Sequence, residues 1–201
     1  TYGGRGRRLA ADPVNRPKIV LDCDPGVDDM FAIFTAIRYC DLVAMTSVAG
    51  NVGIEHTTRN ALALAELVDV DVPVHRGAAH ALVASAEEDA SHVHGATGLG
   101  GVELPDPVAD VASDNAVEAL FDFTSAGDVT PVAIGPLTNI AHAIQRDPAR
   151  TERFPRPVIL GRSTHSGNLT AYAQLHIRLY PYLYFKPIRR VRRSHTTTDQ
   201  R

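Results

Sequence analysis

The feature that most constrains the fold of this chain is a regular alternation of short apolar runs and helical segments, which begins at Lys18. The run Lys-Ile-Val-Leu-Asp-Cys at 18–23 predicts a buried strand, and the Asp-Pro-Gly at 24–26 is typical of a turn. Apolar residues then recur at helical spacing over 27–39. The same pattern repeats downstream, which predicts strands at 18–23, 42–48, 72–75, 129–134 and 157–160, and helices at 27–39, 55–68, 115–125 and 137–146.

Near-continuous apolar strands that alternate with helices indicate the α/β class, with a Rossmann-like parallel sheet and helices on both faces. Ligands of such sheets bind beyond the carboxyl ends of the strands, so functional residues are expected there. Residues 1–17 contain three glycines and two prolines and predict a disordered lead-in. Residues 77–113, rich in Gly, His and Ala, predict a long irregular stretch.

The composition narrows the class of protein further. A chain with 44% hydrophobic and 21% charged residues is an ordinary globular domain, which excludes a disordered, collagen-like or coiled-coil chain. The longest apolar run, 30–37, is far shorter than the ~20 residues that cross a bilayer, so no membrane association is expected. Three arginines within the first eight residues precede no apolar run, which favours a cytoplasmic location over secretion. Cys23 and Cys40 lie in apolar surroundings and are expected to be free thiols.

Four aspartates, Asp22, Asp24, Asp28 and Asp29, fall within eight residues at the end of the first predicted strand. Carboxylates this close raise one another's pKa values or require a cation. A hard divalent ion such as Ca²⁺ or Mg²⁺ prefers oxygen ligands of this kind. An alternative is that Asp28 and Asp29 only stabilise the helix N-terminus, which would explain two of the four acids. The pattern therefore favours a metal or catalytic site.

Two enzyme families begin with an aspartate-rich first strand. Haloacid-dehalogenase-type phosphotransferases use Asp-x-Asp-x-Thr, and Gly26 stands where they would have Thr or Val. The run from Asp22 to Asp29 instead resembles the opening motif of the inosine–uridine preferring nucleoside hydrolases. Later segments resemble the same family in the same order, up to about residue 173. These are Val-Ala-Gly-Asn at 48–51, Thr-Arg-Asn-Ala at 58–61, His-Val-His-Gly at 92–95, Ile-Gly-Pro-Leu-Thr-Asn-Ile at 134–140 and Gly-Asn-Leu-Thr at 167–170.

The resemblance implies hydrolysis of the N-glycosidic bond of a ribonucleoside to ribose and free base, with a Ca²⁺-bound water. It implies that Asp24 is a Ca²⁺ ligand and general base, that Asp29 is a bidentate ligand, and that the backbone carbonyl of Ile134 is a further ligand. The small-molecule nucleoside can be a purine or a pyrimidine nucleoside. The implied substrate contacts are Asp28, Asn51 and Asn168 to the ribose hydroxyls and His94 beside the nucleobase.

Simpler interpretations of these residues stay open. Asn51 follows a glycine and can be an ordinary turn residue. His94 can be a surface histidine of a loop. Asn139 can cap the entry to a helix, and no ligand role is assigned to it.

The resemblance weakens after Ala173. Gln174 and His176 stand where the family has Glu and Asn at ribose-contacting positions, although both side chains can still form hydrogen bonds with a hydroxyl. A late histidine near the base and an aspartate that ligates Ca²⁺ in the family have no counterpart. We therefore expect an α/β domain that is incomplete at its C-terminal side, with uncertain activity. The alternatives are an inactive remnant that at most binds Ca²⁺ or ribose and, less favoured, a metal-dependent phosphotransferase.

The segment 178–201 differs in composition from the rest of the chain. It contains seven of the 20 Lys and Arg residues, three of the six tyrosines and a single acid. The segment can be a surface that binds nucleic acid, an amphipathic edge strand, or the product of a shifted reading frame or truncated gene, and the last is favoured. The predicted division is therefore 1–17, 18–177 and 178–201. No nucleic-acid partner is expected, and a homo-oligomer is possible.

Overall fold

The computed structural model describes residues 16–82 and 91–160, all within one compact unit, Thr1–Arg162. Strands and helices alternate along it as the sequence predicts, and every strand pair is parallel. The strands are β1 (Lys18–Cys23), β2 (Asp41–Ser47), β3 (Val74–His75), β4 (Val129–Ala133) and β5 (Val158–Ile159). The helices are α1 (Val27–Tyr39), α2 (Ile54–Leu67), α3 (Ser91–His94), α4 (Ala116–Thr124), α5 (Thr138–Arg146) and α6 (Pro148–Thr151).

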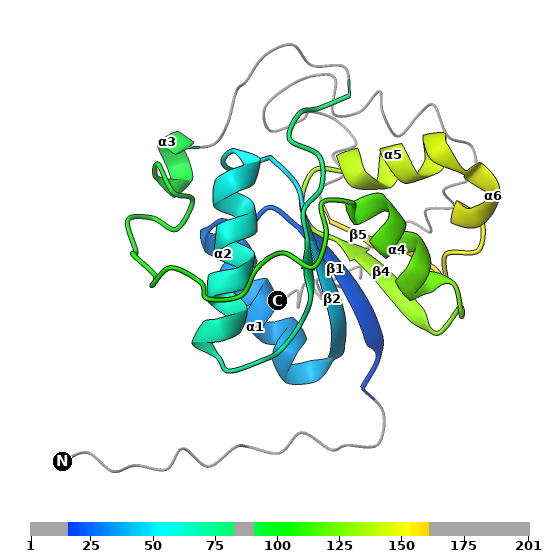
Figure 1. Cartoon of the computed structure of the whole chain (residues 1–201), viewed down its shortest axis with the longest axis horizontal. Helices are drawn as coiled ribbons and strands as arrows, with labels where there is room; N and C mark the ends of the chain where they lie inside the picture. Colours follow the sequence, from blue (N-terminus) through cyan, green and yellow to red (C-terminus); the bar gives the residue numbers. More distant parts are fainter. Residues whose placement is uncertain (1–15, 83–90, 161–201) are drawn as a thin grey trace, which may run out of the picture. The chain divides into compact units, whose positions relative to one another are not determined.

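The five strands form one sheet in the order β3-β2-β1-β4-β5 (Figure 1). The chain moves from β1 outward through β2 to β3 and then returns to the other side of β1 for β4 and β5. The direction of travel thus reverses between β1 and β4. In an open parallel sheet, this reversal opens a crevice at the carboxyl ends of the two central strands.

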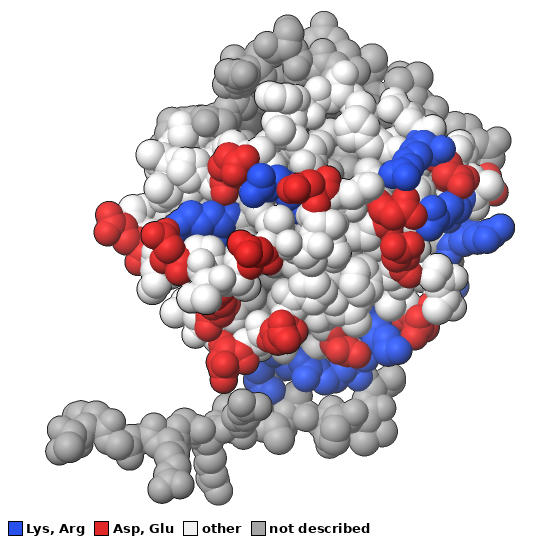
Figure 2. Space-filling model, in the orientation of Figure 1, with Lys and Arg blue, Asp and Glu red and all other residues white. Residues whose placement is uncertain are grey.

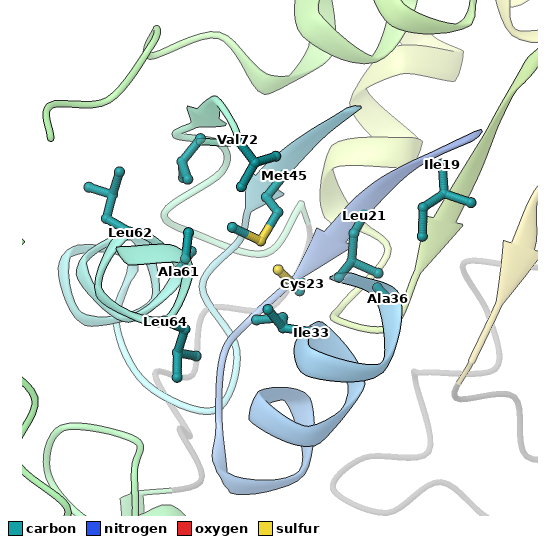
Figure 3. Packing of buried hydrophobic residues seen from close by; sticks show 12 residues of the cluster. Ile19, Leu21, Cys23, Ile33, Ala36, Met45, Ala61, Leu62, Leu64 and Val72 are labelled. Atoms are coloured by element: carbon teal, nitrogen blue, oxygen red, sulfur yellow. The ribbon is translucent and has the colours of Figure 1, made fainter. Parts of the chain in front are cut away.

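The sheet has helices on both faces, which confirms the predicted α/β architecture. Side chains of β1 alternate between the faces. Ile19, Leu21 and Cys23 belong to one core cluster together with Ile33 of α1 and Leu64 of α2. Figure 3 shows members of this cluster between the sheet and helices α1 and α2.

The opposite face has its own core. Val20 of β1 and Ala44 of β2 are fully buried there, in one cluster with Leu120 of α4 and Ile140 of α5. Burial on both faces explains why the strand sequences are apolar at nearly every position. The two cysteines are free thiols, with Cys23 buried and Cys40 partly buried, as the sequence predicts.

Two short helices were not predicted. α3 lies inside the stretch 77–113, which the sequence predicts to be irregular, and α6 follows directly after α5. Each has four residues, which is too short for a helical period to be recognised. The predicted lead-in 1–17 lies outside the described residues except for its last two, and the predicted tail 178–201 lies outside them entirely. The division into three segments stays a prediction.

The surface carries charges of both signs. On the face in Figure 2, Lys and Arg side chains of the described residues alternate with Asp and Glu side chains. One such group joins α4 to the following helices, because Glu118 forms ion pairs with Arg146 and Arg150. Over residues 16–82 and 91–160, no helix has the length and apolar composition that a membrane span requires.

Candidate functional site

The aspartate-rich motif lies at the carboxyl end of β1, where the order of the strands reverses between β1 and β4. Asp24 directly follows the last residue of β1, and Pro25 and Gly26 turn the chain into α1. Asp28 and Asp29 then occupy the first turn of that helix. The motif therefore stands at the carboxyl edge of the sheet, where the sequence predicts functional residues, and the strand order reverses at this point.

The carboxyl group of Asp24 is buried, with the residue only 5% exposed. Its Oδ2 atom accepts a hydrogen bond of 2.7 Å from the backbone N–H of Asn51. Two glycines provide the space around this carboxyl group. A Cβ atom on Gly50 would collide with Oδ2, and a Cβ atom on Gly135 would lie 2.8 Å from Oδ1. The site is thus a cradle of backbone that holds one carboxylate and leaves no room for larger residues.

Asp29 is also buried and shares a partner with Asp24. The side-chain amide of Asn51 donates to Asp29 Oδ2 at 3.1 Å and to the backbone carbonyl of Asp24 at 2.9 Å. The backbone N–H of Gly26 also points to Asp29 Oδ2, at 3.4 Å, in a capping box at the start of α1. Asp29 therefore stabilises the helix N-terminus, as the simpler interpretation held, and at the same time lies beside Asp24.

Burial of the two carboxyl groups changes their chemistry. The pKa of Asp24 is raised, mainly by burial and then by the charge of Asp29. The pKa of Asp29 is raised mainly by burial, with a further increase from the charge of Asp28, while the Gly26 N–H opposes the rise. Two such carboxylates are costly to ionise together unless a cation lies between them.

The oxygen donors at this site fit a hard divalent cation. Asp24 and Asp29 supply carboxylates, and Ile134, directly after β4, supplies a backbone carbonyl next to the Gly135 that packs on Asp24. The backbone N–H of Ile134 donates to the carbonyl of Asp22 at 2.8 Å, which holds this residue at the end of β1. Within the described ranges, no group of three or more His, Cys, Asp or Glu side chains could hold a metal ion.

Asp28 and His94 lie at the outer side of the site. The Asp28 side chain is 80% exposed, and its Oδ1 lies 4.0 Å from Nδ1 of His94. The His94 Nδ1 atom accepts a hydrogen bond of 3.2 Å from the backbone N–H of Val27. A neutral His94 that accepts at Nδ1 carries its proton on Nε2. His94 is thus docked on the N-terminus of α1 and does not stand free on the surface.

The fourth aspartate, Asp22, has a different environment. Its Oδ1 atom accepts hydrogen bonds from Thr46 Oγ1 at 2.6 Å and from Asn139 Nδ2 at 2.7 Å. Burial raises its pKa to about 6, although both hydrogen bonds oppose the rise. Only Asp24 and Asp29 therefore lie together as expected for the four carboxylates. Asp22 forms hydrogen bonds with Thr46 and Asn139 instead, and the Asp28 side chain is exposed.

Two asparagines have structural roles that the sequence did not reveal. Asn139 lies in the first turn of α5, where a capping role was considered, but its side chain bonds Asp22, the Ser47 carbonyl and the Ala78 N–H. Asn60 is fully buried in α2 and donates to two loops. Both residues belong to motif segments, at 58–61 and 134–140, but an amide on a helix gives no sign of its partners in a single sequence.

The remaining predicted site residues, Asn168, Gln174 and His176, lie outside the described residues, and so does the side chain of His92. The structure brings together Asp24, Asp29, Asn51 and position 134, with Asp28 and His94 at the edge. The expected roles of all these residues toward a substrate or metal stay predictions.

Comparison with known protein families gives a match at the same motif. The family model of the inosine-uridine preferring nucleoside hydrolase covers residues 19–179. The non-specific ribonucleoside hydrolase RihC of Escherichia coli O1:K1 / APEC is 43% identical over 170 residues, which are 83% of this chain and 56% of the relative. A probable uridine nucleosidase 1 of Oryza sativa subsp. japonica is 36% identical over 172 residues, 83% of this chain and 53% of the relative.

Solved structures agree with the sequence match. The purine-preferring ribonucleoside hydrolase of Gardnerella vaginalis superposes with a TM-score of 0.71 at 34% identity, over 76% of this chain and 51% of that one. The plant nucleoside hydrolase PpNRh1 gives a TM-score of 0.65 at 36% identity, over 74% of this chain and 49% of that one. The chain thus spans about half the length of the relatives it matches. With a family model over residues 19–179, an α/β sheet shared with solved members and the aspartate motif at its edge, the chain belongs to the inosine-uridine preferring nucleoside hydrolase family.

Proposed function

We propose that this chain carries the ribose-side half of a ribonucleoside hydrolase site and hydrolyses the N-glycosidic bond of nucleosides to ribose and free base. The observation that carries this proposal is the buried pair Asp24 and Asp29, bridged by the Asn51 side chain at the carboxyl edge of the sheet. Family membership supports the reaction class.

Asp24 is proposed as the general base. A carboxylate that is buried and has a raised pKa accepts a proton more readily near neutral pH than an exposed one does. In the reaction, Asp24 takes a proton from water, the water oxygen bonds to C1′ of the ribose, and the glycosidic bond breaks with its electron pair moving to the base. The departing base takes up a proton from solvent, and Asp24 returns its proton to solvent. The Asn51 N–H holds Oδ2 of Asp24, so the carboxylate keeps one orientation throughout.

Asp24, Asp29 and the Ile134 carbonyl are the proposed ligands of Ca²⁺. When bound, the cation lowers the pKa of the attacking water and balances the charge of the two carboxylates. Calcium is favoured over softer ions because all three groups are oxygen donors. Asp28 and Asn51 are proposed to hold the ribose hydroxyls, with Asn168, Gln174 and His176 as further contacts. His94 is proposed to lie beside the nucleobase, with Nε2–H free to donate.

The test measures ribose release from inosine and from uridine in the presence of Ca²⁺, for the wild type and for Asp24→Asn. Asp128→Asn is the matched control, because Asp128 is an exposed carboxylate that pairs with Lys18 at the opposite end of β1. We expect release by the wild type and the control but not by Asp24→Asn. A folded wild type that binds Ca²⁺ but releases no ribose would instead support the inactive remnant, and activity on a generic phosphate ester would support a phosphotransferase.

A further inference from the structure

The buried side chain of Asn60 joins two segments that meet at the proposed substrate site. Its Nδ2 atom donates to the carbonyl of Pro25 at 3.1 Å and to the carbonyl of Thr97 at 2.8 Å. Pro25 lies in the turn that carries Asp24, and Thr97 lies in the loop that follows α3. These partners are 35 and 37 residues away in the chain, so the amide makes a tertiary connection and plays no part in the hydrogen bonding of its own helix.

Among residues 16–82 and 91–160, the loop at 94–102 makes few other hydrogen bonds to the rest of the fold. Its own backbone bonds are local, from Gly98 N to the Gly95 carbonyl, from Gly100 N to the His94 carbonyl and from Val102 N to the Leu99 carbonyl. Leu99 is its one residue in the apolar core, only 3% exposed. A short loop rich in glycine loses much conformational entropy when it is ordered, so it needs such anchors to keep one conformation.

The close approach of Asn60 to this loop depends on Gly98. Gly98 has φ +91°, a conformation that L-residues with side chains rarely adopt. A Cβ atom there would lie 3.1 Å from Asn60 Nδ2 and 3.2 Å from the Pro25 carbonyl oxygen. Glycine at this position therefore lets one amide reach both carbonyls at the same time.

The other end of the loop reaches the site. His94 accepts the Val27 N–H, and a Cβ atom on Gly26 would lie 2.8 Å from His94 Nδ1. The residue that Asn60 binds on one side, Pro25, is the immediate neighbour of both Asp24 and Gly26. Asn60 and His94 therefore contact neighbouring residues of the same turn, Pro25 and Gly26–Val27, directly after Asp24.

We propose that Asn60 is a positioning residue, whose amide holds the 94–102 loop on the Asp24–Gly26 turn and so sets where His94 meets the nucleobase. This inference rests on the proposed function for its effect on the substrate, but the structural link can be tested without it. The NH₂ group of Asn60 provides two donors, one for the buried Pro25 carbonyl and one for the partly buried Thr97 carbonyl, which neither a hydroxyl nor an apolar side chain can replace. Its loss would remove the donor to the buried Pro25 carbonyl and cut the link from α2 to Thr97.

Hydrogen exchange of the whole chain tests the link directly. We expect Asn60→Leu to make the amides of Gly98, Gly100 and Val102 exchange about tenfold faster or more, while amides of β1 and β4 keep their protection. Gly98→Ala perturbs the same contact from the loop side and is expected to give the same pattern if Asn60→Leu fails to fold. Asn115→Ala, which removes the cap of α4, is the matched control and should leave this loop unchanged. Unchanged exchange at 94–102, or a uniform increase over all elements, would overturn the proposal.

Kinetics then separate positioning from a general loss of stability. For a variant that is still folded, we expect KM for inosine to rise about tenfold, with kcat reduced less and with unchanged Ca²⁺ affinity by calorimetry. Equal losses in Ca²⁺ affinity and kcat with an unchanged KM would show that Asn60 only supports the fold, against the proposal. If the wild type releases no ribose, the proposed function fails, and the exchange experiment still decides whether Asn60 holds the loop.

Discussion

The side chain of Asn139 donates to Asp22 Oδ1 at 2.7 Å and connects α5 to the end of β1 across 117 residues of chain. The same amide donates to the Ser47 carbonyl at 2.9 Å and accepts the Ala78 N–H at 2.9 Å. One buried residue of α5 therefore forms hydrogen bonds with the carboxyl-terminal parts of β1 and β2 and with the segment that follows β3. The chain continues from β1 to Asp24 and from β2 to Asn51, which contact each other.

Replacement of Asn139 by leucine should destabilise the protein by about 3 kcal/mol, because it removes hydrogen bonds to three segments and leaves Thr46 as the remaining donor to Asp22 Oδ1. Urea unfolding of the metal-free protein measures this change. Asn115→Ala is the control, with an expected loss of about 1 kcal/mol for one helix cap. A loss at Asn139 no larger than that at Asn115 would contradict the role of this network.

In metal-free buffer, Asp24→Asn should stabilise the protein, and more so as the pH rises. The pKa of Asp24 is raised in the folded state, mainly by burial, so the folded protein binds a proton at this carboxylate more tightly than the unfolded chain does. The free energy of unfolding of the wild type therefore falls as the pH increases from about 4 to about 8, and the asparagine variant does not show this fall. Thermal unfolding in EDTA across this pH range measures the difference.

Asp128→Asn is the control for this prediction, because the pKa of Asp128 is shifted in the opposite direction to that of Asp24. The pKa of Asp128 is lowered by its hydrogen bond and charge interaction with Lys18, so its contribution favours the folded state at neutral pH and is lost in acid. Removal of this carboxylate should produce no stabilisation that grows toward pH 8. If the free energy of unfolding depended on pH in the same way for Asp24→Asn and Asp128→Asn, the burial of Asp24 would not be the cause of the stabilisation.

Added Ca²⁺ should stabilise the wild type and raise its free energy of unfolding by about 2.7 kcal/mol at a concentration one hundred times Kd. The effect should increase with pH because the carboxylates must lose their protons before they bind the ion. We expect Asp29→Asn to abolish the stabilisation and Asp28→Asn to keep most of it, because Asp28 is exposed and Asp29 is buried beside Asp24. Equal effects of the two variants in differential scanning fluorimetry would argue against the proposed ligand set.

Gly135→Ala should weaken Ca²⁺ binding at least about tenfold, because the added methyl group would press on the Asp24 carboxyl group. Gly53→Ala is a matched control, since nothing lies within 4 Å of a Cβ atom at that position. Calorimetric titration with Ca²⁺, together with circular dichroism to confirm folding, tests the pair. Unchanged affinity in Gly135→Ala would mean that Asp24 does not need its present position to bind the ion.

Much of the fold could be predicted from periodicity alone. β1 and α1 have the predicted bounds, and the other predicted strands and helices are found within two residues of theirs. This works because strands buried on both faces are continuously apolar and the helices between them have one apolar side. The four-residue helices α3 and α6 were missed, because one turn of helix leaves no period to detect.

The sequence by itself determined the class of fold, the family and the place of the carboxylates, since a local motif at the end of an apolar strand is enough for all three. Only the tertiary structure decided which carboxylates meet. It paired Asp24 with Asp29, exposed Asp28 and engaged Asp22 with Asn139. It also gave Asn51, Asn60 and Asn139 their partners, because an amide can form hydrogen bonds with any carbonyl or carboxylate that folding brings within reach, and that choice is made by segments far apart in the chain.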